Sequence, residues 1–283
     1  MKTERSCANG PQDLKAGGDG LIQSYTPMKD PTLPKWRRML ARELRERSRF
    51  ESLSVGEWRS LLETRSVTSS NHDTVLSLDW PHYCAGASQA CGGPRGWCYT
   101  FTGLQAGENH VRKVAMVDAL ATLHPALFAE RVVLEVERAV RSGALPYANL
   151  RYSGSGELNA CHVKGLALVA TRGVRLWGFT RNLVVASALR AAEIPVIVSY
   201  DRSTVLRHVL AARRKGFPLG YSSEGVDDGP PHPSVVVFPV HRSGRIPEVV
   251  DVPELCPKVV HEYLHQERPP AMCQSVCQRC HQP

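Results

Sequence analysis

Three evenly spaced cysteines are the residues best suited to do chemistry. Six residues separate Cys84 from Cys91 and six separate Cys91 from Cys98, in a segment rich in glycine and other small residues. Glycines let the backbone fold closely around a compact inorganic group, and three thiolates leave one metal position without a protein ligand. The spacing therefore predicts a [4Fe–4S] cluster with an open iron. The alternative is a structural zinc ion completed by His82, His110 or a distant cysteine, although zinc sites more often contain paired cysteines.

A second group of thiols lies near the end of the sequence. Its members are Cys256, Cys273, Cys277 and Cys280, with His281 beside the last of them. A polar, proline-flanked segment of this kind cannot build its own apolar core, so a bound metal would supply its folding free energy. We expect either a second iron–sulfur cluster or a zinc ion, the zinc being held by four cysteines or by three and His281.

The number of cysteines also indicates the cellular compartment in which the protein resides. The chain has nine of them, and its N-terminus, MKTERSCANG, lacks the apolar run of a secretory signal. In a reducing cytosol thiolates stay free to bind metal, and no stretch approaches the roughly 18 apolar residues that span a bilayer. We therefore expect a cytoplasmic protein with no membrane partner. Cys7 and Cys161 stand apart, and Cys161 is interpreted as a small buried side chain or, alternatively, as a catalytic thiol.

Polar side chains follow several of the predicted strands. In residues 151–157 a Gly-Ser-Gly turn lets a ligand approach the strand end, and Glu157 can accept a hydrogen bond from an ammonium group. A plain connecting turn is the alternative. Arg181 and Arg202 can clamp a carboxylate or phosphate, or form surface ion pairs. The predicted cofactor-binding residues are Ser153, Gly154, Gly156, Glu157, Thr180, Arg181, Asn182, Ser199 and Arg202.

The elements that must position these residues alternate regularly. Strands are predicted at 74–78, 148–152, 174–179, 196–199, 218–221 and 235–238. Helices are predicted at 109–142 with a break at Pro125, and at 159–171, 182–193 and 203–214. This alternation predicts right-handed βαβ crossovers and a parallel sheet. The predicted fold class is α/β: a partial, open parallel β/α barrel of about six strands, whose site residues gather at the carboxyl ends of the strands.

These elements divide the chain into four regions. Residues without periodicity come first and are expected to be disordered. An N-terminal helical layer follows, in which Ser54 and Glu57 predict a capping box. The regions are a disordered segment at 1–33, the helical layer at 34–73, the α/β partial-barrel core at 74–245 and a Cys-rich metal-binding tail at 246–283.

The cysteine segment and the turn at Glu157 together resemble the core of radical S-adenosylmethionine enzymes. The resemblance rests on Trp97-Cys98 after the first strand and on the small-residue turn that ends in Glu157 after the second. It implies that the three evenly spaced cysteines hold a [4Fe–4S] cluster and that Gly156 and Glu157 contact S-adenosylmethionine. It also implies that reductive cleavage of this cofactor yields a radical that abstracts hydrogen from a substrate.

More narrowly, the order of motifs over residues 75–283 resembles the phage gene-product-eighty-eight domain family of phages and bacteria. The motifs are residues 84–99, residues 151–157, the run Trp177-Gly-Phe-Thr-Arg-Asn182, and Cys256-Pro257 with the terminal cysteines. This resemblance implies a phage-related protein with a bound cluster, without defining a reaction.

The net positive charge of the chain indicates which partners it could bind. The 283 residues are 42% hydrophobic, which excludes a disordered chain, and 35 basic residues against 27 acidic ones give a formal net charge of +8. Many basic residues lie between Lys35 and Arg49, as a solvated helix face or as a nucleic-acid footprint. We expect an iron–sulfur enzyme that needs an electron donor if redox-active and whose unknown substrate could be a nucleic acid. The alternative is a zinc-stabilised nucleic-acid-binding protein without catalysis.

Overall fold

The computed structural model describes residues 34–70, 76–81, 107–223, 230–234 and 236–239. The helices there are α1 (Pro34–Glu51), α2 (Val55–Thr64), α4 (Glu108–Leu123), α5 (Pro125–Arg141), α6 (His162–Ala170), α7 (Leu183–Ala191) and α8 (Leu206–Arg214). The strands are β1 (Ser69–Ser70), β2 (Leu76–Asp79), β3 (Asn149–Ser155), β4 (Arg175–Trp177), β5 (Phe179–Thr180), β6 (Ile197–Tyr200), β7 (Leu219–Ser223) and β8 (Val236–Pro239). This order confirms the predicted alternation, while the predicted segments 1–33 and 246–283 lie outside the described residues.

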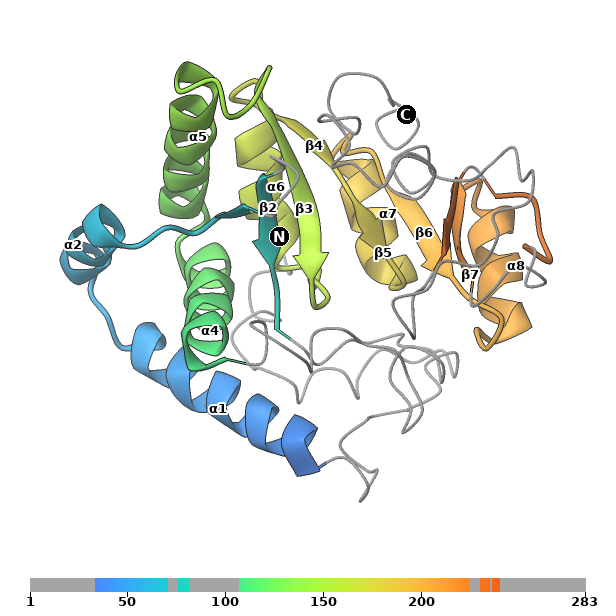
Figure 1. The fold of residues 1–283 in the computed structure, drawn as a ribbon, viewed down its shortest axis with the longest axis horizontal. Helices are drawn as coiled ribbons and strands as arrows, with labels where there is room; N and C mark the ends of the chain where they lie inside the picture. The colour runs from blue at the N-terminus through green and yellow to red at the C-terminus, as the bar shows by residue number, and fades with distance from the viewer. Residues whose placement is uncertain (1–33, 71–75, 82–106, 224–229, 235, 240–283) are drawn as a thin grey trace, which may run out of the picture.

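Hydrogen bonds join the strands into two four-stranded sheets, β1-β2-β3-β4 and β5-β6-β7-β8. β1 runs antiparallel to β2, and every other neighbouring pair is parallel, which confirms the predicted parallel pairing. Gly178 alone separates β4 from β5, and its carbonyl accepts a hydrogen bond from the Ile197 N–H at 3.3 Å. Among the strands of the described ranges, neither sheet closes into a barrel. The protein is therefore a mixed α/β protein with parallel-rich sheets (Figure 1).

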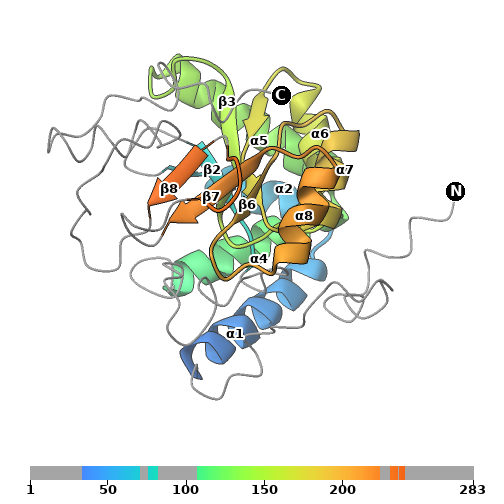
Figure 2. The ribbon, with the colours of Figure 1, turned by 90° about the vertical axis from the view of Figure 1, so that its right-hand side faces the viewer.

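The helices pack against one face of the strands. Alternate residues of a strand point to opposite faces, and Leu150 and Tyr152 of β3 belong to the main apolar core together with residues of α4, α5 and α6. Val198 and Leu219 join the same core with residues of α7 and α8. Figure 2 shows α6, α7 and α8 together on one side of the strands. These helices therefore cover one face of the sheets. The connections at the carboxyl ends of the strands lie at the edge of the sheets, where parallel α/β folds form their sites.

Local sequence signals set several element boundaries. α4 ends at Leu123 and α5 begins at Pro125, which confirms the predicted break, because proline is tolerated at the first position of a helix and not in its interior. The capping box is also confirmed: Ser54 Oγ accepts from the Glu57 N–H at 3.3 Å, and the Glu57 carboxylate accepts from the Ser54 N–H at 2.7 Å. This box begins α2.

Two helices begin later than their hydrophobic patterns predict. α6 begins at His162 instead of residue 159, because the Asn159 side-chain oxygen accepts a hydrogen bond from the Cys161 N–H at 2.8 Å. α8 begins at Leu206 instead of residue 203, because an Asp201 carboxylate oxygen accepts from the Ser203 N–H at 2.9 Å. Asn and Asp side chains form such turns in competition with helix hydrogen bonds.

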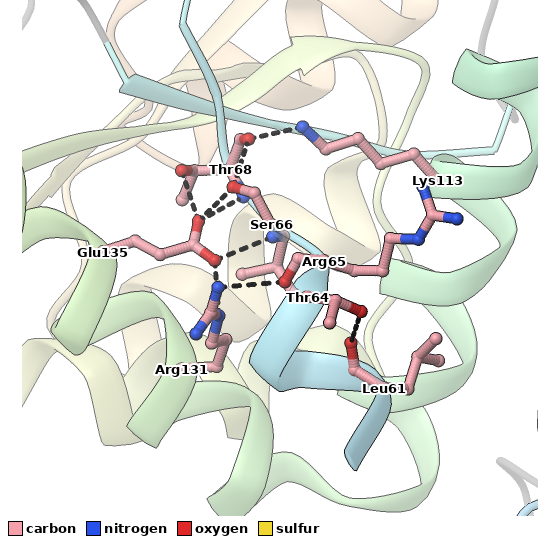
Figure 3. A network of polar contacts seen from close by, with 9 residues as sticks. Leu61, Thr64, Arg65, Ser66, Thr68, Lys113, Arg131 and Glu135 are labelled. Atoms are coloured by element: carbon pink, nitrogen blue, oxygen red, sulfur yellow. Dashed lines mark hydrogen bonds and ion pairs between the residues drawn. The ribbon is translucent and has the colours of Figure 1, made fainter. Parts of the chain in front are cut away.

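A buried carboxylate on α5 secures the connection between α2 and β1. The Glu135 carboxylate accepts from the backbone N–H groups of Val67 and Thr68 at 3.0 and 2.9 Å, and from the hydroxyls of Ser66 and Thr68 at 2.6 Å. Arg131 Nε pairs with it at 2.6 Å (Figure 3). Because β1 begins at the next residue, Ser69, this network fixes the edge of the first sheet against α5.

Candidate functional site

The predicted metal ligands Cys84, Cys91, Cys98, Cys256, Cys273, Cys277 and Cys280 lie outside the described residues. Cys161 lies at the N-terminus of α6, where it is partly exposed and disulfide-bonded. The interpretation of Cys161 as a buried apolar side chain is therefore wrong. In the part of the chain that the structure describes, no three His, Cys, Asp or Glu side chains form a group that could hold a metal ion.

The predicted cofactor-binding residues lie at or just after the ends of β3, β5 and β6. We call this region the carboxyl edge and define it by Glu157, Thr180, Arg181 and Asp201. Ser153 and Gly154 are in β3, Thr180 ends β5, Ser199 is in β6, and Gly156, Glu157, Arg181, Asn182 and Arg202 lie in the connections that follow these strands. The structure brings Glu157, Thr180 and Arg181 into contact.

Other predicted residues of this set have structural partners. The Asn182 side-chain oxygen caps α7 by accepting from the N–H groups of Val184 and Val185 at 2.9 and 3.4 Å. Ser153 Oγ accepts from the Phe179 N–H at 2.8 Å and so links β3 to β5. Arg202 is exposed and Ser199 is partly exposed.

Glu157 is the central group of the carboxyl edge. Its side chain is buried, and Thr180 Oγ1 donates to its Oε1 at 2.6 Å while the Arg181 N–H donates to its Oε2 at 3.1 Å. Burial raises the pKa of the Glu157 carboxyl from its ordinary value of 4.5 to about 7, although both hydrogen bonds and the Arg181 charge act in the opposite direction. A carboxyl group with such a pKa can hold or release a proton near neutral pH.

The raised pKa of Glu157 predicts a pH dependence of stability. Between pH 4.5 and about 7 the folded protein holds a proton on Glu157 that the unfolded chain has lost, so the free energy of unfolding falls as the pH rises through this window. The fall should be on the order of 2–3 kcal/mol. Urea denaturation at pH 5 and pH 8 measures it, and Glu157→Gln should remove that part of the difference. Equal pH slopes in the two proteins would contradict the assignment.

Arg181 connects Glu157 to the next strand. Arg181 Nη1 pairs with Asp201 Oδ2 at 2.8 Å, and the Asp201 side chain is fully buried. The second oxygen, Oδ1, accepts from the Ser203 N–H at 2.9 Å and from Ser203 Oγ at 2.8 Å. The guanidinium is thus held by a partner that directly follows β6, while the backbone of the same residue holds Glu157. Asp201 is not among the predicted site residues. Its partner, Arg181, follows a different strand, so the sequence does not show that the two side chains meet.

Gly156 brings the end of β3 against the end of β2. Its φ is +69°, and a Cβ at this position would lie 1.9 Å from the Trp80 carbonyl oxygen. The backbone of the next residue, Glu157, donates to the Pro81 carbonyl at 3.3 Å. Only glycine combines this dihedral with so close an approach. The turn therefore fixes where the chain leaves β2 at Pro81.

Another buried carboxylate, that of Asp79, lies at the last position of β2. It accepts from Ser69 Oγ at 2.6 Å and from Ser155 Oγ at 2.9 Å, and Ser155 Oγ lies 3.5 Å from His110 Nε2. Lys113 Nζ donates to Ser69 Oγ at 3.0 Å and also to the Thr68 carbonyl. Burial lowers the pKa of Lys113, and the nearby carboxylate of Asp79 opposes that shift. A carboxylate that ends a buried strand is the signal that could have identified this cluster.

Buried aromatic and charged groups hold Trp80, the residue that follows β2, in place. Trp80 stacks on His162 with 4.2 Å between ring centroids, and His162 Nδ1 accepts from the Asn159 N–H at 3.1 Å. The other ring nitrogen of His162 therefore donates to Asp118 Oδ1, at 2.6 Å. Asp118 Oδ2 pairs with Arg47 on α1 at 2.7 Å. This chain of contacts fixes Trp80, and hence the departure of the chain from β2.

No helix in the described residues has both the length and the apolar character needed to cross a membrane. No protein-family model, curated protein or solved structure gives a match to this chain.

Proposed function

We propose that this chain is an iron–sulfur enzyme of the radical S-adenosylmethionine type, in which Cys84, Cys91 and Cys98 hold a [4Fe–4S] cluster at the carboxyl edge. The single observation that carries this proposal is the contact between the Glu157 N–H and the Pro81 carbonyl at 3.3 Å. This contact holds Pro81, after which the cysteine segment follows in the sequence, beside the turn that carries Glu157. Cys84 is the third residue after Pro81, so the chain can carry Cys84 no more than about 11 Å from it.

Both ends of the cysteine segment support the proposal. The segment follows Pro81 and leads into α4, whose first turn carries His110. Ser155 contacts Asp79 on the departing side and lies 3.5 Å from His110 on the returning side. The residues on both sides of the segment therefore contact the same strand, β3, which supports the proposal that its thiols act at the carboxyl edge.

Cys161 adds a further sulfur to this side of the fold. It lies four residues after Glu157, at the start of α6, and it is disulfide-bonded. Reducing conditions would convert that disulfide to thiols, which are the form that binds metal.

The buried groups of the carboxyl edge fit the amino acid part of S-adenosylmethionine. Glu157 accepts from Thr180 Oγ1 and from the backbone N–H groups of Arg181 and Leu158. A carboxylate has about four lone-pair sites, so one remains that can accept from an ammonium group. Arg181 holds Glu157 in place through its backbone N–H, while Asp201 holds its guanidinium. When bound, cluster and cofactor would supply the radical chemistry, while these residues orient the cofactor and exclude water.

The arrangement of strands suits an open barrel, which we include in the proposal. β2, β3 and β4 are parallel, β5 to β8 are parallel, and Gly178 alone joins β4 to β5. We propose that the two sheets act as one curved wall with helices outside and the site at its carboxyl edge.

Metal analysis with matched cysteine variants tests the proposal. The full chain, reconstituted with iron and sulfide without oxygen, should bind about four irons per cluster and absorb near about 400 nm. Cys98→Ala and the triple variant Cys84→Ala/Cys91→Ala/Cys98→Ala should lose one cluster and the binding of S-adenosylmethionine. Cys7→Ala should lose neither, and Cys273→Ala/Cys277→Ala/Cys280→Ala should lose only the metal of the tail. Unchanged iron content in the first triple variant would refute the proposal.

The alternative, a zinc-stabilised nucleic-acid-binding protein, is disfavoured by the contacts of α1. Arg47 is buried against Asp118 and Glu51, and Arg49 pairs with Glu46 at 2.8 Å, so these arginines are partly neutralised within the chain. The exposed basic residues that the alternative could use include Arg42 and Arg45 on α1, and Arg213, Arg214 and Lys215 at the end of α8. Zinc as the only bound metal, with DNA or RNA affinity that falls steeply with salt, would favour the alternative.

A further inference from the structure

The face of the first sheet that points away from the helices carries polar side chains. Leu150 and Tyr152 of β3 point into the core with α4, α5 and α6. Asn149 and Arg151 alternate with them and therefore lie on the other face. The register pairs Arg151 with Trp177 on β4, so these side chains are neighbours on this face.

Arg151 lies beside two neighbouring aromatic rings. Its guanidinium carbon lies 5.7 Å from the ring centroid of Trp177 and 5.6 Å from that of Phe179. In the described ranges no carboxylate forms an ion pair with Arg151, and its buried Nε has no hydrogen-bond partner. The two rings are neighbours, with centroids 6.3 Å apart and planes at 84°, so they contact the guanidinium from one side. A guanidinium held in this way can still bind a planar oxyanion through its N–H groups.

Asn149 is a second group on this face without a partner. Its side chain is 0% exposed, and neither its amide nitrogen nor its amide oxygen has a hydrogen-bond partner among the described residues. The buried serines of the same strand do have partners, since Ser153 accepts from Phe179 and Ser155 donates to Asp79. A buried amide left unsatisfied lowers stability, so it calls for an explanation at this position.

We propose that this face binds a ligand with a carboxylate or phosphate group, which Arg151 receives, while Asn149 binds a second polar group of the same ligand. Residues two apart on a strand are separated by about 6.6 Å, which sets the distance between the two ligand groups. Arg151 is partly exposed, so the oxyanion of the ligand reaches it from solvent, whereas Asn149 is fully buried. The ligand site goes beyond the proposed function, because it requires neither the cluster nor its cofactor.

Binding of simple oxyanions to the full chain tests this site. Titration calorimetry at constant ionic strength would use adenosine 5′-monophosphate and inorganic phosphate as phosphate probes, with succinate as the carboxylate probe and adenosine as the uncharged control. Binding of the phosphate probes, of succinate or of both identifies the source of the oxyanion. Arg151→Met should weaken that binding at least about tenfold. Arg190→Met is the matched control, because Arg190 stacks on Phe217 at 4.1 Å on the helical side, and it should leave binding unchanged.

Asn149→Leu separates a ligand-binding role from a structural one. Leucine removes the unsatisfied buried amide at similar volume, so the variant should melt at a higher temperature than the parent chain. If Asn149 contacts the ligand, the same variant should bind the oxyanion probe that the parent binds at least about tenfold more weakly. A higher melting temperature with unchanged binding would overturn the role of Asn149. Absence of binding by all charged probes up to about 10 mM, or equal binding by Arg151→Met, would overturn the site.

Discussion

Replacing Gly156 by alanine should lower the free energy of unfolding by more than about 4 kcal/mol. A Cβ at Gly156 would lie 1.9 Å from the Trp80 carbonyl oxygen and 2.8 Å from that of Pro81, and backbone atoms cannot move aside as a flexible side chain can. The left-handed φ of +69° adds a further about 1–2 kcal/mol for any residue with a Cβ. Urea denaturation, or the loss of a cooperative thermal transition, measures the effect.

Gly216→Ala is the matched control for this prediction. Gly216 has the same φ of +69°, but no atom lies within 4 Å of a Cβ built there. Its substitution should therefore cost only the dihedral penalty, about 1–2 kcal/mol. The difference between the two variants isolates the close approach of β3 to the end of β2. If Gly156→Ala and Gly216→Ala lose the same stability, the tight turn is not what fixes the carboxyl edge.

Removing the charge of Asp201 should cost about 3–5 kcal/mol of unfolding free energy. Asp201→Asn leaves the Arg181 guanidinium without its carboxylate, although that side chain is only 10% exposed. An asparagine oxygen can replace one carboxylate oxygen, but its amide nitrogen must then face a donor, either Arg181 or the Ser203 N–H. The loss of stability should be measured by urea denaturation at pH 7, where the pair is charged.

A double-mutant cycle distinguishes this pair from a general sensitivity of the region. Arg181→Met and Asp201→Asn together should lose about 1–3 kcal/mol less than the sum of the single losses, because the second change removes a group that the first left unpaired. Arg207→Met removes a charge from an exposed position on α8 and should change stability by less than about 0.5 kcal/mol. Additive losses at Arg181 and Asp201 would mean that the two side chains do not stabilise each other.

Most of the secondary structure could be predicted because its signals are local. The alternation of apolar runs predicts the parallel strands β2, β3, β6, β7 and β8 within a few residues of their observed bounds. Pro125 and the Ser54–Glu57 box mark helix ends by covalent geometry and short-range hydrogen bonds. The late starts of α6 and α8 were not predicted, because hydrophobic periodicity does not register the turns formed by Asn159 and Asp201.

The partners of the site residues could not be predicted in the same way. Asp79 and Ser155 are 76 residues apart in the chain, and Thr180 is 23 residues from Glu157. Residue types show that such groups can donate or accept, but they do not select one partner among the many polar residues that follow strands. Parallel pairing with crossover helices makes that selection, because it places successive strand ends side by side.

The sequence alone established the alternating α/β order, the Gly-rich turn before Glu157 and the grouping of most cysteines in two segments. These features depend on residue type and spacing over a few residues, which can be seen in the sequence. Only the tertiary structure decided that Glu157 is buried under Thr180 and Arg181 with a pKa near 7, and that Arg151 and Asn149 share a face with Trp177. Burial and proximity depend on which surfaces the folded chain brings together, and a carboxyl or guanidinium group acquires its chemistry from that environment.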